Sequence, residues 1–399
     1  MSDSGIPGDD RPQEPQEPQE SHGPEATGAS RADDPPGGPG NGSAEPAPGQ
    51  EESRGPWRRR AVGTLIGALG ATFVSLVFIA SFMGALHAPG PRAVPIAVVG
   101  TQAQASAISD SLGKVRSGGY TVTSYPTAQA ARNAILERKV NAALLPAPPG
   151  AVLAVATAAG SAVTNATVAD VSTVAQASGT QLALQNVRPL PANDPQGISQ
   201  VFFVIALLAP SLVFANMLVT RFGKAMHPVG QLLSILAYSV IVAAVAVAVT
   251  DPGIGALTGA PWGLFGIGTL LAFAAAVTAA AAARWARGLG YLVVFLLFIP
   301  VGVASSGTTL GPHMITQWYA DVGKALPAGA ALPAVQNTVY FDGNDITTPL
   351  LILSAWAVAG AMALALTAVF RPPAFGSGGH HEEPAHPAGD AGAAAGAPG

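Results

Sequence analysis

From Ala61 to Leu86 the chain reads AVGTLIGALGATFVSLVFIASFMGAL, a run without a charged side chain. At about 1.5 Å of rise per residue, a helix over this run is long enough to cross the roughly 30 Å hydrocarbon core of a bilayer. The run follows Trp57 and three arginines, and it is too long for the apolar part of a cleavable signal peptide. We therefore predict a first transmembrane helix over residues 57–87.

The stretch of mixed polarity from Ala88 to Ile198 organises the rest of the chain, because it lies between this run and five later ones. The later charge-free runs are Ser199–Thr220, Val229–Thr250, Trp262–Ala283, Gly288–Ser305 and Leu350–Phe370. The composition agrees with a membrane protein, since 11% of residues are charged against about 25% in soluble proteins. The prediction is an α-helical polytopic membrane protein with six transmembrane helices and an extracytoplasmic domain, residues 88–198, between the first two. Residues 199–371 form the five-helix block.

The basic residues indicate the orientation, because Lys and Arg near short loops stay on the cytoplasmic side. With the N-terminus inside, nine basic residues flank the spans on the inner side, and Lys324 is the one in the short outer loops. The nine are Arg54, Arg58, Arg59, Arg60, Arg221, Lys224, Arg284, Arg287 and Arg371. We expect a multi-pass protein of the plasma membrane with both termini in the cytoplasm.

Residues 88–198 show the alternation of a small α/β domain. Val94–Val99 and Tyr120–Tyr125 predict strands, and Ala103–Val115 between them predicts a helix. Thr127 is suited to cap a second helix that runs to about Lys139. Shorter apolar strands at 140–145 and 152–158 and a helix at 161–177 complete the expectation. The predicted core residues are Ile96, Val98, Ile108, Leu112, Ile135, Leu136, Leu144 and Leu145.

Residues 306–348 are too polar to span a membrane and too apolar for an ordinary loop. They predict two short helices on the outer side, with Pro327 ending the first, packed on the bundle. From this segment and its start we take a candidate outer gate: Ser305, Ser306, Gly307, Trp318, Asp321, Lys324, Pro327 and Tyr340. Asp321 and Lys324 either gate a path or form an ordinary ion pair three residues apart on a helix.

Glycines four apart, Gly63 with Gly67 and Gly259 with Gly263, are candidate positions for close helix packing, within one chain or between two. The terminal segments 1–56 and 372–399 are rich in Pro, Gly and Ala or acidic residues, and we expect both to be disordered cytoplasmic tails. The N-terminal tail is either a solvated leader or a partner-binding segment.

The chemistry of an enzyme is not evident in the chain. Each Gly-Lys pair lacks the Ser or Thr and the glycine-rich loop of a phosphate-binding motif. The chain has no cysteine, and His380, His381 and His386 lie in a tail without fixed geometry. We expect no catalytic residue, cofactor, metal site or nucleic-acid partner. The predicted spans also lack the ionisable residues that proton- and ion-coupled transporters use.

The order of these parts resembles the ABC-2 type permeases, especially the branch that includes the phage-infection-protein group. The matching segments are Val94–Val99 as the opening strand, Ala128–Leu145 with Pro146 as helix and strand, and Ser305-Ser306-Gly307 with Trp318, Ala325-Leu326-Pro327 and Tyr340-Phe341 as the outer motif. The resemblance covers about residues 57–371. It implies a permease subunit, in a homodimer or heterodimer, with a separate ATPase.

Two functions therefore stand as hypotheses. The first is an exporter subunit that moves a hydrophobic or envelope substrate outward, driven by that ATPase, and the outer segment favours it. The second is a scaffold or receptor of the cell envelope whose exported domain binds a partner. The cytoplasmic loop at 221–228, which is short for an ATPase contact, favours the second.

Overall fold

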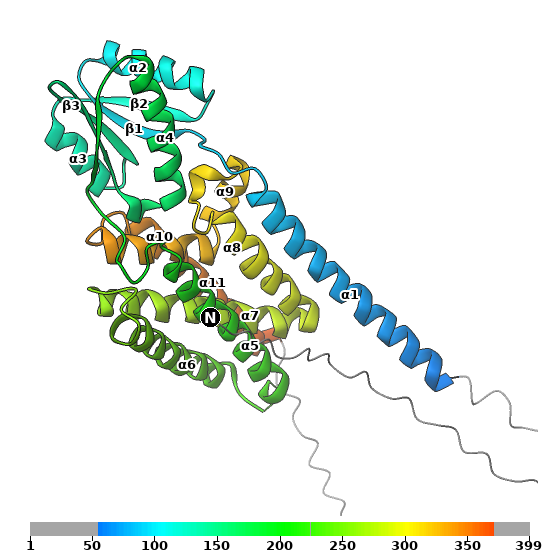
Figure 1. The fold of residues 1–399 in the computed structure, drawn as a ribbon. Helices are drawn as coiled ribbons and strands as arrows, with labels where there is room; N and C mark the ends of the chain where they lie inside the picture. The colour runs from blue at the N-terminus through cyan, green and yellow to red at the C-terminus, as the bar shows by residue number, and fades with distance from the viewer. Residues whose placement is uncertain (1–54, 224, 371–399) are drawn as a thin grey trace, which may run out of the picture. The chain divides into compact units, whose positions relative to one another are not determined.

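The computed structural model describes residues 55–223 and 225–370 (Figure 1). The predicted tails, apart from Gly55 and Pro56 at the start of the first helix, lie outside the described residues, as do the three tail histidines and the flanking residues Arg54, Lys224 and Arg371. By contacts the chain divides into two compact units, Met1–Val62 and Gly63–Gly399. The described part of the first unit is the start of helix α1 (Gly55–Leu86).

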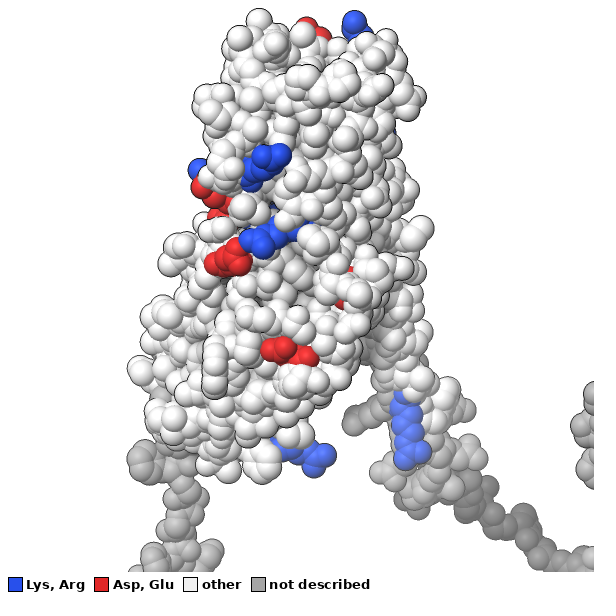
Figure 2. Space-filling model, turned by 60° about the vertical axis from the view of Figure 1, so that its left-hand side comes forward, with Lys and Arg blue, Asp and Glu red and all other residues white. Residues whose placement is uncertain are grey.

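Among residues 55–223 and 225–370, five helical runs are long and apolar enough to cross a membrane, by length and composition. They are Arg60–Leu86, Ser199–Phe222, Pro228–Gly253, Pro261–Ser305 and Thr347–Thr367. They include α1, α5 (Ser199–Phe222), α6 (Pro228–Ala248), α7 (Pro261–Leu296) and α11 (Thr347–Phe370). Figure 2 shows a face on which Lys, Arg, Asp and Glu are few and large areas carry none of them. The chain has the character of a membrane protein.

The fourth run holds two of the predicted spans. It is 45 residues long, and it continues from α7 through one wide turn, Leu297–Val301, into the short helix α8 (Gly302–Ser305). The backbone leaves the helical conformation at Ala286 (φ −122°, ψ 17°) and Arg287 (φ 54°, ψ −137°). Six apolar runs in the sequence thus appear as five membrane-length helical runs, of which one is broken at residues 286–287.

Helix α7 forms the centre of the helical block, where it packs against α5, α6 and α11. Its buried face consists largely of alanine, including Ala272, Ala276 and Ala280. Small side chains let neighbouring helices approach closely. At Gly360 of α11 the approach is so close that an added Cβ would lie 2.8 Å from Thr278 Oγ1. The core of the block therefore depends on small residues.

Residues 94–186 contain a five-stranded mixed sheet, with strand order β2-β1-β3-β4-β5. The strands are β1 (Val94–Val99), β2 (Tyr120–Tyr125), β3 (Ala142–Ala147), β4 (Gly150–Val155) and β5 (Leu182–Asn186). Strands β1, β2 and β3 are parallel, β4 runs antiparallel to β3, and β5 is parallel to β4. One face of the sheet packs on α3 (Ala128–Leu136) and the other on α2 (Gln102–Val115) and α4 (Ser161–Ala177).

The sequence predicts most of these elements correctly. The strands at 94–99 and 120–125 and the helix at 161–177 are confirmed, and Thr127 caps α3 by accepting a hydrogen bond from Ala130 N at 3.1 Å. Strand β5 was not expected. Five predicted core side chains are buried: Ile96, Val98, Leu112, Ile135 and Leu145.

Three of the predicted core side chains are half-buried instead: Ile108, Leu136 and Leu144. Ile108 and Leu144 line an apolar cavity of about 140 Å³ between the sheet, α2 and α4. Leu136 is the last residue of α3, where the helix ends. Ile108 and Leu144 still pack against the core cluster between the sheet, α2 and α4. A periodic pattern therefore shows the inward face of a helix or strand and not how completely that face is covered.

The outer segment, residues 306–348, contains the two expected short helices, α9 (Gln317–Lys324) and α10 (Pro327–Tyr340). The expected role of Pro327 is wrong, because α9 ends at Lys324 and Pro327 occupies the first turn of α10. The missing N–H of proline has no cost there, since the first amides of a helix have no partner within it.

Candidate functional site

The outer segment and the α/β domain share a polar cavity of about 280 Å³. The α/β domain contributes Arg138, which follows α3, and the backbone at Ala159 and Gly160. Helix α5 contributes Gln200 from its first turn. The remaining polar lining comes from Ser305 at the end of α8 and from the outer segment: Ser306, Thr308, Thr309, Lys324, Gln336, Asn337 and Asp345.

Arg138 is the charged side chain that the α/β domain places in this cavity. Its Nη2 donates a hydrogen bond to Gln336 Oε1 at 3.0 Å, and its guanidinium carbon lies 4.5 Å from the centre of the Phe341 ring. Burial lowers the pKa of Arg138 to about 10, and the nearby charge of Asp345 partly offsets this shift. No carboxylate pairs with Arg138 within 4.0 Å among residues 55–223 and 225–370.

Two residues of the cavity lining carry a buried amide oxygen that has no hydrogen-bond donor among the described residues. Gln200 Oε1 and Asn337 Oδ1 are both unpartnered, although the residues are only 6% and 1% exposed. The Asn337 amide nitrogen donates to Asp345 O at 3.2 Å, which fixes the side chain at the wall of the cavity. A buried acceptor without a donor costs about 1–3 kcal/mol. These oxygens are therefore unsatisfied acceptors in two side chains of the cavity wall.

Three of the candidate gate residues line the cavity: Ser305, Ser306 and Lys324. Lys324 Nζ also pairs with Asp321 Oδ1 at 2.7 Å, between two exposed side chains, as the ordinary reading of this pair requires. Ser305 is fully buried, and its carbonyl oxygen would lie 2.3 Å from a Cβ at Gly323. The end of α8 and the end of α9 thus meet through backbone contact at this glycine.

The other candidate gate residues lie away from the cavity lining. Trp318 is exposed, whereas Pro327 is buried at the start of α10. Gly307 adopts a left-handed φ of 79° where the chain turns after α8. The hydroxyl of Tyr340 is buried without a partner among the described residues, and burial, helped by the charge of Asp194, raises its pKa to about 12.

The α/β domain is fixed to the outer segment by two buried apolar side chains. Phe341, fully buried, belongs to the same cluster as Ile135 and Leu145 of the α/β domain. Met314 packs with Val94 and Val163 in a second cluster. Each side chain comes from the outer segment and completes a core that belongs to the sheet domain.

Polar contacts surround both of these side chains. Near Met314, the Arg92 guanidinium donates to Met314 O at 2.9 Å, and Arg92 N donates to His313 O at 2.9 Å. Near Phe341, Arg188 forms an ion pair with Asp342, and Asn344 donates to Leu136 O at 3.2 Å. The contact between the α/β domain and the outer segment is therefore specific as well as apolar.

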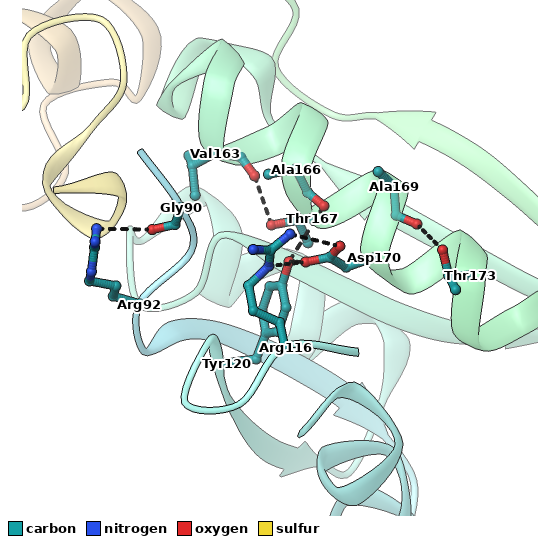
Figure 3. Close-up of polar contacts among 10 residues, drawn as sticks. All are labelled: Gly90, Arg92, Arg116, Tyr120, Val163, Ala166, Thr167, Ala169, Asp170 and Thr173. Carbon is teal, nitrogen blue, oxygen red and sulfur yellow. Dashed lines mark hydrogen bonds and ion pairs between the residues drawn. The ribbon is translucent and has the colours of Figure 1, made fainter. Parts of the chain in front are cut away.

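A polar cluster around the buried carboxylate of Asp170 holds three elements of the α/β domain together (Figure 3). Asp170 of α4 accepts two hydrogen bonds from Arg116, from Nε at 2.7 Å and Nη2 at 3.3 Å, and one from the Tyr120 hydroxyl at 2.6 Å. Burial alone would raise the pKa of Asp170, but the bonds from Arg116 and Tyr120 outweigh it and lower the pKa. Because its partners satisfy Asp170, the cluster joins α2, β2 and α4 and is structural.

The four glycines proposed for helix packing differ in their surroundings. An added Cβ would meet no atom of the described chain within 4 Å at Gly63, Gly67 or Gly259. At Gly263 it would lie 2.5 Å from Thr338 Cγ2, so this glycine allows α7 to approach α10. The close approach at Gly360 between α11 and α7 was not expected from the sequence.

The sequence reasoning did not find the residues that give the cavity its character. Arg138, Gln200 and the pair Gln336-Asn337 come from three places in the chain that only the fold brings together. The sequence gives a partial indication of these residues. Gln336-Asn337 is a polar pair inside the apolar run of α10, and Gln200 lies at the start of a charge-free run.

Residues 55–223 and 225–370 contain no cluster of His, Cys, Asp and Glu suited to a metal ion. No protein-family model matches the chain, and no curated protein matches it.

Proposed function

We propose that the chain is the membrane permease subunit of an ABC-2 type exporter, which moves a hydrophobic or envelope substrate outward and is driven by a separate ATPase. The family comes from the resemblance of the sequence. The observation that supports a moving role is the double attachment of the α/β domain to the outer segment through Met314 and Phe341. A rigid attachment of this kind transmits movement of the helical block to the domain, whereas a passive anchor needs only a tether.

The proposal includes six transmembrane helices with both termini in the cytoplasm. The 45-residue run from Pro261 to Ser305 would be roughly 68 Å long as one straight helix, about twice the thickness of the hydrocarbon core. The break at Ala286 and Arg287 divides it into two segments of transmembrane length. Arg287 then lies at the inner surface, as basic residues near short loops do.

Single cysteines test this topology, because the chain has none of its own. Ala225→Cys and Ala177→Cys both introduce a thiol at an exposed position, the first in the proposed inner loop and the second in the α/β domain. An impermeant thiol reagent applied to intact cells should label Ala177→Cys and spare Ala225→Cys until the cells are opened. Labelling of Ala225→Cys in intact cells would reject the orientation.

A contact between two proposed inner loops supports a surface for the ATPase. Arg284 Nη1 donates to Gly223 O at 2.7 Å, so the loop after α5 is fixed to the break in α7. The chain purified with its neighbouring proteins should retain an ATPase, and Arg284→Gln should weaken that association while the protein still inserts. If no ATPase co-purifies and efflux does not depend on ATP, the exporter proposal fails.

The outer segment is the proposed gate, and Gly323 is its most sensitive position. Gly323→Ala would place a Cβ 2.3 Å from Ser305 O, which forces α9 away from α8. Gly266→Ala adds the same methyl group to a helix position with open space, so it is the matched control. Efflux from cells should change in Gly323→Ala and not in Gly266→Ala, with both proteins inserted at parental levels. Equal efflux from cells that carry the parent, Gly323→Ala or Gly266→Ala would reject the gate hypothesis.

The alternative is a non-transporting scaffold or receptor whose α/β domain binds a partner. The apolar cavity lined by Ile108, Leu144 and Leu182 favours it, because it is a binding surface that lies within the domain itself. A scaffold would lose partner binding through substitutions in residues 88–198 and would be indifferent to Gly323→Ala. The efflux comparison above therefore separates the two functions.

A further inference from the structure

We propose that the polar cavity between the α/β domain and the outer segment binds a small zwitterion, in which a phosphate or carboxylate group lies close to a primary ammonium group. The proposal goes beyond transport. It rests on the proposed topology only for placing the cavity on the outer side of the membrane. It identifies the ligand from the groups that line the cavity and their unmet hydrogen-bonding capacity.

The anionic half of the ligand is assigned first to Arg138; Lys324, the other cationic side chain of the lining, already pairs with Asp321 and adds positive charge at the edge of the site. The structure gives Arg138 one hydrogen bond, from Nη2 to the neutral Gln336 Oε1, and no paired carboxylate within the described chain. A guanidinium presents a planar set of donors that matches a phosphate or carboxylate. A mostly buried guanidinium without a counter-ion in contact gains most from such a group.

The cationic half is assigned to the acceptors of the same cavity. Gln200 Oε1 and Asn337 Oδ1 are buried without a donor from the described residues, and Asp345 adds a carboxylate to the lining. A primary ammonium group has three N–H donors for these three acceptors. A trimethylated ammonium carries the same charge and no N–H donor. The lining therefore favours a primary ammonium over a quaternary one.

Binding to the purified full-length chain tests the assignment. The chain is placed in nanodiscs of phosphatidylcholine, and phosphoethanolamine and phosphocholine are titrated by calorimetry. Phosphoethanolamine should bind, and phosphocholine should bind at least about tenfold more weakly, because it cannot satisfy the amide oxygens. Equal affinities would overturn the ammonium assignment.

Substitutions locate the binding in the cavity. Arg138→Gln should weaken phosphoethanolamine binding roughly 10- to 100-fold, the effect of losing a charged hydrogen-bond partner. Lys139→Gln removes the same charge from the next residue, an exposed side chain paired with Glu137 outside the cavity, and should bind like the parent. Gln200→Met removes an acceptor that no described residue uses, so it should weaken binding about tenfold without lowering the melting temperature of the unliganded protein. If the melting temperature of Arg138→Gln is far below that of the parent, loss of binding in this variant can result from unfolding, and the affinity of Gln200→Met alone tests the proposal. Parental affinity in Gln200→Met overturns the proposal.

The source of the zwitterion is the second question for the same protein. Nanodiscs that contain phosphatidylethanolamine distinguish a lipid headgroup from a free solute. Retention of this lipid through delipidation, lost in Gln200→Met and not in Lys139→Gln, identifies the headgroup as the ligand even if free phosphoethanolamine does not bind. Binding of the free compound without lipid retention identifies a soluble zwitterion. If neither lipid retention nor binding of free phosphoethanolamine is observed, the proposed site is rejected. This result leaves the exporter proposal unaffected, because no step measures efflux or ATP hydrolysis.

Discussion

Replacing Phe341 by alanine should weaken the attachment of the α/β domain to the outer segment. The ring is fully buried in one cluster with Ala97, Ile135 and Val140 of the domain. Truncating a buried phenylalanine to alanine typically costs about 3–5 kcal/mol, from lost burial and the cavity left behind. The guanidinium of Arg138, 4.5 Å from the ring centre, adds a cation–π term of about 0.5–2 kcal/mol. The attachment should therefore weaken by at least about 3 kcal/mol.

A buried thiol reports this detachment. Val140 is 4% exposed in the same cluster, and Val140→Cys introduces a side chain of similar size into a chain without cysteines. If modification requires the opening that frees Phe341, 3 kcal/mol corresponds to roughly a hundredfold faster labelling. Trp318→Ala removes an exposed aromatic side chain of the outer segment and is the control. Equal labelling rates in Phe341→Ala and the parent would refute the view that this ring holds the domain in place.

Three further outcomes are expected. Tyr120→Phe should lower the stability of the full chain in detergent by about 1.5–3 kcal/mol, since it removes a 2.6 Å hydrogen bond to the buried carboxylate of Asp170; an unchanged melting temperature would contradict this. Burial lowers the pKa of His313 despite its bond to Arg92, so the folded state binds fewer protons than the unfolded state just below pH 6.5. The melting temperature should therefore fall as the pH falls below about 6.5, and His313→Gln should reduce that fall. Gly360→Ala would place a Cβ 2.8 Å from Thr278 Oγ1 and should destabilise the helical block by about 1–3 kcal/mol, while Gly266→Ala should melt like the parent.

The elements of the fold were accessible from the sequence because each follows from a local pattern. Strand β1 is a short β-branched run, and Thr101 caps the start of α2, where its side chain and that of Gln104 form a capping box. Strand β5, Leu182–Asn186, is not predicted from the sequence, because its residues are mostly exposed and only its pairing with β4 makes it a strand. Local patterns predict elements and miss those that depend on a partner.

The polar cavity was harder to predict from the sequence, because the residues that line it are unremarkable in the sequence. Arg138 lies in a Glu-Arg-Lys run at the end of a helix, where a solvated charge is the ordinary expectation. Its burial depends on Phe341 and Gln336, about 200 residues later. Ser305 and Ser306 were identified through a resemblance and line the cavity, whereas Trp318, from the same motif, is exposed. A motif indicates which segment matters and leaves open which side chain of it faces inward.

The burial of Phe341 in the sheet domain also affects the order in which the protein is assembled. The last strand of the domain ends at Asn186, so the ribosome makes about 155 more residues before Phe341 exists. At about 5–20 residues per second, this interval lasts roughly 8–30 s. During it the domain lacks a side chain of its own core, and the apolar surface around Ile135 is open to other chains. Biogenesis should therefore depend on a chaperone at that surface, or on slow completion of the sheet domain after the last transmembrane helix has inserted.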